Sequence, residues 1–468
     1  MNQSIQYFAK EPKIYPKRVW GRYRIMKWVL MAVTLGIYYL APFVRWDRGE
    51  NAPNQAILID MANHRGYFFF IEIWPQEVYY LTGLLILAAV GLFFITSLAG
   101  RVWCGYLCFQ TVWTDLFVWV ERIVQGDRNA RKKLDESRLT WEKIYKKTIT
   151  HMIWLVIGAC TGGAWVLYFN DAPTLMDNLA HGHIDRPVLG WVIALTLTTY
   201  LMAGFARQQV CKYMCPYARF QSAMFDRNTL IIGYDEVRGE PRGKLNKDGI
   251  GDCIDCSLCV QVCPMGIDIR DGLHYECIAC GLCIDACNGV MEKIQRPAGL
   301  IRYDTMVNQE LRAAGMADHS WKHYVVRWRS VWYVGIMTVV GSVMLYALVT
   351  RSPQEMNILH DRNPLMVKLS DGSIRNGYDV RILNKTHEDR SYRLRIEGID
   401  GARIMMQGAG QNDPEHIPVF ADSVGHIRIF VIAPPKEAMA ERHDIRFILE
   451  DLSQPIITEE ESMFIYEP

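Results

Sequence analysis

The chain has 468 residues, which is enough for two or three domains, and half of its residues are apolar. Its 51 lysines and arginines against 50 aspartates and glutamates leave a formal net charge of +1. No overall basic field therefore favours a nucleic-acid partner. These averages conceal a strong segregation of apolar residues along the chain.

Five apolar runs are long enough to cross a bilayer as helices, which takes about 20 residues each. They are 28–44, 78–100, 148–170, 187–206 and 330–350. The first run is too long for the apolar core of a signal peptide, and Lys27 at its start can extend to the membrane surface. The sequence predicts a five-helix α transmembrane bundle, with a membrane domain at 1–206 and the fifth helix at 330–350.

The distribution of lysine and arginine predicts the orientation in the membrane. Seven of these residues lie in the first 27 positions, whereas three follow the first predicted helix before the second begins. Ten lie between the second and third helices, and one lies between the third and fourth. We expect a cytoplasmic N-terminus, a cytoplasmic segment at 207–329, and an outer domain at 351–468 that is periplasmic in a bacterium.

A further apolar segment, 102–120, follows Arg101 directly and contains Asp115. If it crossed the membrane, the basic loop 121–147 would lie outside, against the charge bias. We therefore expect an amphipathic or re-entrant helix at the cytoplasmic face.

Two cysteine pairs lie where predicted membrane helices meet the cytoplasm: Cys104 with Cys108, and Cys211 with Cys215. A spacing of four on a helix would place both sulphurs on one face, about one turn apart. Soft thiolates favour Cu(I), zinc or iron-sulphur clusters, so the pairs are a candidate copper site. The alternative is that they are small buried residues at a crowded helix junction. Cys160 lies alone in the third predicted helix and is interpreted as packing.

Histidines carry less information. His181 and His183 alternate in the second outer loop, where they could hold Cu(II) or zinc, but solvated loop side chains are the simpler interpretation. The sequence contains no phosphate-binding glycine loop, dinucleotide fingerprint or Ser-His-Asp order of a hydrolase.

Eight cysteines have the spacing of a two-cluster ferredoxin, Cys-x2-Cys-x2-Cys-x3-Cys in each of two runs. The runs are Cys253, Cys256, Cys259, Cys263 and Cys277, Cys280, Cys283, Cys287. In such ferredoxins the fourth cysteine of each run ligates the other cluster. We expect one 4Fe-4S cluster on Cys253, Cys256, Cys259 and Cys287, and a second on Cys277, Cys280, Cys283 and Cys263. Zinc, which would want longer gaps between the halves, and disulfides are the alternatives.

This pattern predicts a cytoplasmic two-cluster ferredoxin-like domain at about 245–295. Pro264 turns the chain after the first run, whereas Asn288 stands at the equivalent place in the second. Proline is not a ligand, so the replacement leaves the cluster prediction unchanged. The chain also leads directly from the fourth predicted helix toward the first cluster, so we expect the paired cysteines to receive electrons from the clusters.

The C-terminal part alternates apolar and polar residues with the period of β-strands. The alternating sets are Tyr378, Val380, Ile382; Tyr392, Leu394, Ile396; Ile427, Ile429, Val431; and Ile445, Phe447, Leu449. Several such runs separated by turn residues within about a hundred positions predict a C-terminal immunoglobulin-like β-sandwich. It contains no cysteine, whereas the paired and clustered cysteines lie on the predicted reducing side.

The ordered combination of these motifs resembles the FixG-type cytochrome c oxidase accessory proteins. It includes Trp103-Cys-Gly-Tyr-Leu-Cys108, Gln110-Thr-Val-Trp113, Cys211-Lys-Tyr-Met-Cys215-Pro216, both ferredoxin runs and the terminal β-domain. The resemblance implies a membrane iron-sulphur protein of the bacterial inner membrane that reduces Cu(II) to Cu(I) for cbb-type oxidase assembly. It implies oxidase assembly factors and copper-transporting proteins as partners, with an unknown electron donor. Family members usually have proline after the cysteine at position 108, where this chain has Phe109, which puts the turn geometry of the first pair in doubt.

Two alternative functions remain open at this point. One is a quinol-linked electron-transfer subunit of a periplasmic reductase, whose relatives share the double ferredoxin runs but generally lack the fifth helix and the β-domain. The other is a non-catalytic assembly scaffold whose clusters are structural.

Overall fold

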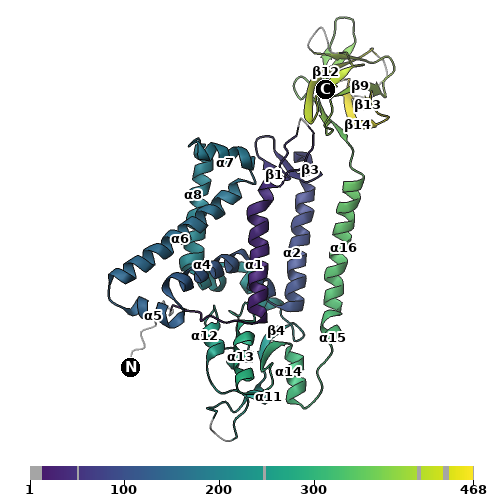
Figure 1. Cartoon of the computed structure of the whole chain (residues 1–468). Coiled ribbons are helices and arrows are strands. Elements are labelled where there is room, and N and C mark those ends of the chain that lie inside the picture. Colours follow the sequence, from purple (N-terminus) through teal and green to yellow (C-terminus); the bar gives the residue numbers. More distant parts are fainter. Residues whose placement is uncertain (1–12, 50–51, 246–248, 408–412, 436–441, 467–468) are drawn as a thin grey trace, which may run out of the picture. The chain divides into compact units, whose positions relative to one another are not determined.

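The computed structural model describes residues 13–49, 52–245, 249–407, 413–435 and 442–466 (Figure 1). The chain forms two compact units, of which one contains 1–44 with 55–344 and the other contains 45–54 with 345–468. The first unit carries the cysteines and most of the helices. The second is built of β-strands.

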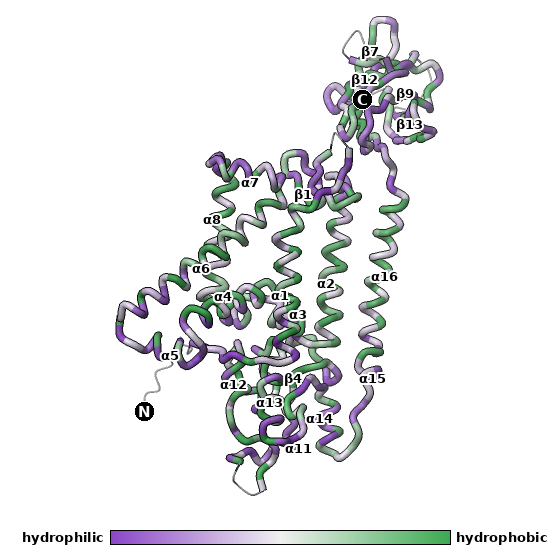
Figure 2. Tube along the Cα trace, viewed as in Figure 1, coloured by the Kyte–Doolittle hydropathy of each residue, from purple (hydrophilic) through white to green (hydrophobic). Residues whose placement is uncertain are grey.

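The predicted apolar runs are helical. Among the described residues, five helical stretches are long and apolar enough to cross a membrane: Arg22–Phe43, Pro75–Ala99, Trp141–Val166, Arg186–Met214 and Trp328–Val349. Their α-helices are α1 (Arg22–Leu40), α2 (Tyr79–Ala99), α6 (Trp141–Val166), α8 (Arg186–Leu201) and α16 (Trp328–Val349). Apolar residues line these helices (Figure 2). Their length and composition indicate a membrane protein.

The fourth stretch is longer than predicted. Beyond α8 it continues through a π-helical segment (Met202–Ala206), the short α9 (Arg207–Gln209) and a second π-helical segment (Val210–Met214). The next helix, α10 (Pro216–Met224), begins at a proline, which disfavours helical geometry at the residue before it. The fourth helical stretch thus ends at Met214 instead of at residue 206, and it contains Cys211.

The segment 102–120 forms two helices, α3 (Val102–Tyr106) and α4 (Phe109–Gln125), and α4 is not among the helices apolar and long enough to cross a membrane. Its acidic residues face inward. Asp115 accepts two hydrogen bonds of 2.7 and 2.9 Å from Arg24 and lies 3.5 Å from the Lys27 ammonium. Lys27 is only 4% exposed, so the expectation that it extends to the membrane surface is wrong. The cause is the buried carboxylate of Asp115, which compensates its charge.

The remaining helices of the first unit are short. They are α5 (Arg128–Glu136), α7 (Ala172–Ala180), α11 (Glu236–Gly239), α12 (Leu258–Val262), α13 (Leu282–Lys293), α14 (Met306–Ala313) and α15 (Trp321–Val325). Strand β4 (Ile231–Tyr234) pairs antiparallel with β5 (Ile301–Asp304). This pairing brings together the two ends of the cysteine-rich segment that lies between the strands in the sequence. A three-stranded sheet is formed by β1 (Ile57–Asp60), β2 (Arg65–Phe68) and β3 (Ile71–Ile73). Within this unit, α11 to α14 gather at one end of α1 and α2, and β1 to β3 lie at the other end (Figure 1).

A carboxylate next to the cluster cysteines holds the start of α1. Asp285, in α13, accepts hydrogen bonds from the backbone N–H groups of Tyr23 and Arg24 at 3.2 and 2.8 Å. These are among the N–H groups of the first turn that have no partner within their own helix. The first membrane helix is thereby tied to the segment between Cys283 and Cys287.

The second unit is a sandwich of two antiparallel sheets. One has the order β10-β12-β8-β6 with β7 paired to β8, and the other has the order β11-β9-β13-β14. The strands are β6 (Gln354–His360), β7 (Val367–Lys368), β8 (Ile374–Asn384), β9 (Arg390–Glu397), β10 (Arg403–Met406), β11 (Ile417–Val419), β12 (Ser423–Ala433), β13 (Arg442–Asp451) and β14 (Ile457–Ile465).

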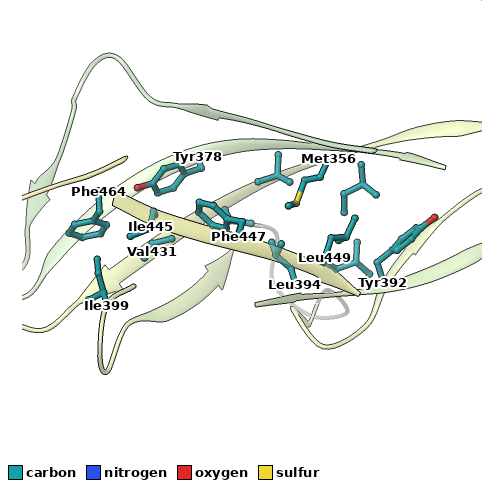
Figure 3. Packing of buried hydrophobic residues seen from close by; sticks show 14 of the residues in the cluster. Met356, Tyr378, Tyr392, Leu394, Ile399, Val431, Ile445, Phe447, Leu449 and Phe464 are labelled. Atoms are coloured by element: carbon teal, nitrogen blue, oxygen red, sulfur yellow. The ribbon is translucent and has the colours of Figure 1, made fainter. Parts of the chain in front are cut away.

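The alternating residues of the sequence form the core of this sandwich (Figure 3). Tyr378, Phe447 and Leu449 are completely buried, and the rings of Tyr378 and Phe447 meet at a centroid distance of 5.2 Å. The four predicted strands are β8, β9, β12 and β13, so their prediction is confirmed.

Candidate iron-sulphur and thiol sites

The eight ferredoxin-type cysteines surround two cavities. One cavity is lined by Cys253, Cys256, Cys259 and Cys287. The other is lined by Cys263, Cys277, Cys280 and Cys283, with Cys259 at its edge. Each set takes three thiols from one run and a fourth from the other. The structure thus brings together the two sets of four that the spacing predicts.

The two runs share an unusual backbone conformation. The residue before the second cysteine of each run is left-handed, Asp255 with φ 52° and Ala279 with φ 51°. The residue after it is left-handed as well, Ser257 with φ 54° and Gly281 with φ 72°. Such conformations cost energy in residues other than glycine and persist only where surrounding structure maintains them. Here they fold each loop so that its first three cysteines line one cavity.

The arrangement of these thiols does not suit zinc. Tetrahedral zinc, with bonds of about 2.3 Å, holds its sulphurs about 3.8 Å apart. Within the described part of the chain, no cysteine belongs to a group of three ligand atoms that all lie within 4.8 Å of one another. All thirteen cysteines are free thiols, so no disulfide forms either. Four thiols spread around a cavity instead fit a cluster of several metal atoms.

Burial strengthens the dependence of these thiols on a ligand for their charge. It raises the pKa of Cys287 and of Cys277 to about 12, and that of Cys263 to about 11. Without a bound cluster these groups are protonated at neutral pH, and ligation must release the protons.

Asn288 takes a role that proline could not. In the first run, α12 ends before Cys263, which is its C-cap, so Pro264 lies outside the helix. In the second run, Cys287 and Asn288 lie inside α13, which continues to Lys293. The Asn288 side chain accepts a 2.9 Å hydrogen bond from the N–H of Gly299. Proline in a helix interior would remove a backbone hydrogen bond and clash with the preceding turn.

The four paired cysteines come together, although the pairs lie about a hundred residues apart. The Cys211 thiol lies close enough to the thiols of Cys104, Cys108 and Cys215 for their charges, if ionised, to be felt. Cys104 and Cys211 also belong to one apolar cluster. As with the cluster cysteines, three of these sulphurs do not lie within 4.8 Å of one another. They form an open set of thiols and not a closed tetrahedral site.

Each pair is built on the same turn, and the expected continuous helix is absent. The N–H of Cys108 donates to the Trp103 carbonyl at 3.0 Å, and the N–H of Cys215 donates to the Val210 carbonyl at 2.8 Å, five residues back in each case. Each second cysteine is extended and occupies the N-cap of the following helix, with φ, ψ of −61°, 126° at Cys108 and −80°, 111° at Cys215. The prediction that each pair lies on one helix face is therefore wrong, because the helix breaks at the second cysteine. Phe109 leaves this turn unchanged.

The first pair contacts the second cluster run. A side chain added at Gly105 would lie 2.6 Å from the carbonyl oxygen of Ile278 and 3.0 Å from Cα of Cys280. The Tyr106 hydroxyl donates a 2.9 Å hydrogen bond to the Cys280 carbonyl. Cys104 and Cys211 pack in one apolar cluster with Cys263 and Cys280. The pairs thus lie beside the second cysteine set.

A buried arginine accompanies this thiol set, which sequence reasoning missed. Arg101 is 4% exposed, and its Nε donates a 2.9 Å hydrogen bond to the side-chain oxygen of Gln221. The Cys104 thiol donates to the same oxygen at 3.4 Å. Burial raises the pKa of Cys104 to about 11, and the charge of Arg101 opposes that rise. A lone arginine after an apolar run gave no signal of this contact in the sequence.

The other predicted candidates stand apart. His181 is exposed, and its Nδ1 lies 2.9 Å from the backbone carbonyl of Asp177. Neither His181 nor His183 joins a group of three close metal ligands in the described ranges. Cys160 is exposed on α6 and belongs to neither thiol set.

Comparison with known families supports iron-sulphur clusters in this chain. A family profile for a 4Fe-4S dicluster domain matches residues 206–306, which contain both ferredoxin runs. A second profile, for a 4Fe-4S binding domain, matches residues 81–126, where Cys104 and Cys108 lie. A third, for the immunoglobulin-like fold at the C-terminus of FixG, matches residues 344–467.

Similar proteins cover nearly the whole chain. Protein RdxB of Cereibacter sphaeroides is 49% identical over 459 residues, which are 96% of this chain and 95% of that protein. Nitrogen fixation protein FixG of Rhizobium meliloti is 46% identical and covers 95% of this chain and 91% of its own length. The crystal structure of a FixG-related protein from Vibrio parahaemolyticus matches 24% of this chain and 96% of its own, with 26% identity and a TM-score of 0.21. The chain therefore belongs to the FixG family and is an iron-sulphur protein.

Proposed function

We propose that this protein is a membrane electron-transfer protein that reduces Cu(II) to Cu(I) for the assembly of a cbb-type cytochrome c oxidase. The observation that carries the proposal is the direct contact between the Cys104 pair, through Gly105 and Tyr106, and the loop that holds Cys280. Iron-sulphur clusters supply single electrons, and Cu(II) reduction consumes one electron per ion. Such a transfer requires the copper ion to lie close to a cluster, and the thiol set beside the cluster run provides that position.

The first part of the proposal assigns the cluster ligands. One 4Fe-4S cluster takes Cys253, Cys256, Cys259 and Cys287, and the other takes Cys277, Cys280, Cys283 and Cys263. The two cavities lined by these sets support the assignment.

Metal analysis tests this assignment. Anaerobically purified protein is expected to contain about eight iron atoms and eight sulphides per chain, as two cuboidal clusters require. Cys256→Ser should lower the iron content by about half, because Cys256 lines only the first cavity. Zinc in place of iron, with no paramagnetic signal on reduction, would contradict the assignment.

The second part places the copper substrate at Cys104, Cys108, Cys211 and Cys215. Thiolates bind Cu(I) more strongly than Cu(II), so binding there raises the copper potential and favours reduction.

Serine variants of each pair test the copper site. Cys104→Ser with Cys108→Ser, and Cys211→Ser with Cys215→Ser, should each abolish Cu(II) reduction and leave the iron content intact. Cys160→Ser is the matched control, since this exposed thiol lies outside both sets. Copper binding, Cu(II) reduction and iron are measured on the same samples. If the quadruple variant reduces copper like the parent protein, the pairs are structural and His181 with His183 become the next candidates.

We place the protein in the bacterial inner membrane, with the N-terminus and the cluster segment in the cytoplasm and residues 351–468 in the periplasm. Cbb-type oxidase assembly factors and copper-transporting proteins are the proposed partners. The positive residues of the loops around α1, α2 and α6 support this orientation.

A quinol-linked role is the second candidate, and a cavity favours it. Apolar Val118 and Ile278 meet polar Gln110 and Asp115 in this cavity, next to Cys211. A few convergent polar groups in an apolar cavity are typical of cofactor sites. If added quinol transfers electrons to the iron-sulphur clusters and the protein does not reduce Cu(II), this role would be favoured over the first. Clusters that cannot be reduced would favour a structural scaffold.

A further inference from the structure

A groove lies where the chain enters α1 and passes the end of α4. Its volume is about 640 Å³. Three arginines and three tryptophans line it: Arg18, Arg24, Arg122, Trp20, Trp28 and Trp119. Tryptophan and arginine together are typical of the boundary between the lipid core and water. The groove's lining residues on α1 lie at the N-terminal end of that helix. The cysteine-rich elements gather at the same end (Figure 1).

Apolar side chains continue the groove along the two helices. Ile25 and Val29 of α1 are 45% and 55% exposed, and Ile123 of α4 is 63% exposed. In water such an apolar surface would be unfavourable. A hydrocarbon chain lying in the groove would cover it.

Buried positive charge at the groove lacks a full set of partners. Arg24 is 3% exposed; its Nη1 binds Asp115, but its Nη2 has no hydrogen-bond partner among the described residues. The same holds for Nε of Arg122, whose Nη2 binds only the backbone carbonyls of Pro16 and Lys17. Burial and the nearby charge of Arg24 lower the pKa of Arg122 to about 10.

The charged residues among those that line the groove are Arg18, Arg24 and Arg122. The nearby carboxylates are already engaged: Asp115 pairs with the Arg24 guanidinium, and Asp127 and Asp285 accept hydrogen bonds from the backbone N–H groups of Arg18 and Arg24. An anionic group in the groove would balance the positive charge of its lining and provide acceptors for the unpartnered guanidinium nitrogens.

We propose that this groove is a binding site for an anionic phospholipid, with the phosphate at Arg18, Arg24 and Arg122 and an acyl chain over Ile25, Val29 and Ile123. Basic pockets beside membrane helices bind anionic headgroups in this way. The lipid would fasten α4, whose N-cap is Cys108, to the start of α1.

Native mass spectrometry of the full-length protein in mild detergent tests the site, with phosphatidylglycerol and phosphatidylcholine of identical acyl chains as probes. Phosphatidylglycerol should be retained at least tenfold more strongly. Arg18→Gln and Arg122→Gln should each weaken its binding about fivefold, the effect of one basic residue near an anionic surface. Arg138→Gln is the matched control, because Arg138 is exposed in the same basic loop but does not line the groove.

The variants also separate binding from folding. Arg122 donates hydrogen bonds to two backbone carbonyls, so Arg122→Gln could disturb folding, which a lower iron content would reveal. The Arg18 side chain is exposed, so Arg18→Gln tests lipid binding even if Arg122→Gln is misfolded. Equal binding of the two lipids, or binding that both variants leave unchanged, would overturn the proposal. Recovery of a quinone in place of phospholipid, lost on Arg18→Gln, would overturn it as well.

Discussion

At Gly105 the absence of a side chain lets two distant parts of the chain touch. The glycine lies between Cys104 and Tyr106, and its backbone contacts the loop of Ile278 and Cys280. The Trp-Cys-Gly motif thus joins a thiol pair to a cluster run, which the motif alone does not reveal. Gly105 is not among the glycines with positive φ, so its backbone angles do not require glycine. Glycine is required because a side chain would have no room next to the loop of Ile278 and Cys280.

Gly105→Ala should therefore destabilise the protein and separate the two sites. The added methyl group would meet backbone atoms at 2.6 to 3.1 Å, which cannot move aside as a flexible side chain would. We expect a loss of about 1–3 kcal/mol in the free energy of unfolding, as for other overpacked sites. We also expect slower Cu(II) reduction at unchanged copper binding. Chemical unfolding in detergent and stopped-flow reduction measure the two effects.

Gly163→Ala is the control for this substitution. Gly163 lies inside α6 with nothing within 4 Å of an added methyl group. Because glycine is a poor helix former, this change should be neutral or stabilising by about 0.5–1 kcal/mol. Equal effects of the two variants would show that Gly105 makes no special contact.

At the scale of elements, the same turn occurs twice. Cys104 to Cys108 and Cys211 to Cys215 each end in a hydrogen bond spanning five residues, with an extended second cysteine at a helix N-cap. At the second turn Pro216 forces this conformation, since proline disfavours helical geometry in the residue before it. At the first turn Phe109 adopts the same geometry without proline.

Phe109→Pro should consequently be tolerated. Cys108 already has the φ and ψ that precede a proline, Phe109 is the first residue of α4, and its side chain is 72% exposed. We expect unchanged iron content, copper binding and unfolding midpoint.

Val112→Pro, three residues later, is the contrasting variant. It removes the 3.0 Å hydrogen bond from the N–H of Val112 to the Cys108 carbonyl and should cost about 3 kcal/mol or more. A comparable loss of stability in Phe109→Pro would mean that the first turn differs from the second.

At the scale of the whole molecule, the cysteines and the β-sandwich belong to different units. Every cysteine lies in the unit of 1–44 and 55–344, and the sandwich core contains none. The proposed orientation gives this division a chemical reason, because thiolate ligands need a reducing compartment.

Reporter fusions test the orientation. Fusions after Asn129 and Val307 should behave as cytoplasmic, and a fusion after Asp371 as periplasmic, because lysine and arginine are retained on the cytoplasmic side. The measurement is the activity of a reporter enzyme that is active on one side only. An external signal at Asn129 would show that the segment of α3 and α4 crosses the membrane.

The sequence by itself determined the features that arise from local, periodic chemistry. These are the apolar helices, the alternating strands of the sandwich and the two cysteine runs, whose spacing lets three thiols of one run and one of the other line each cavity. The tertiary structure alone decided which distant segments meet. It paired Lys27 with Asp115, brought Cys104 and Cys211 together, and set them beside Cys280. Such contacts depend on packing and compensation of charge between parts of the chain that no local spacing connects, so no single motif could predict them.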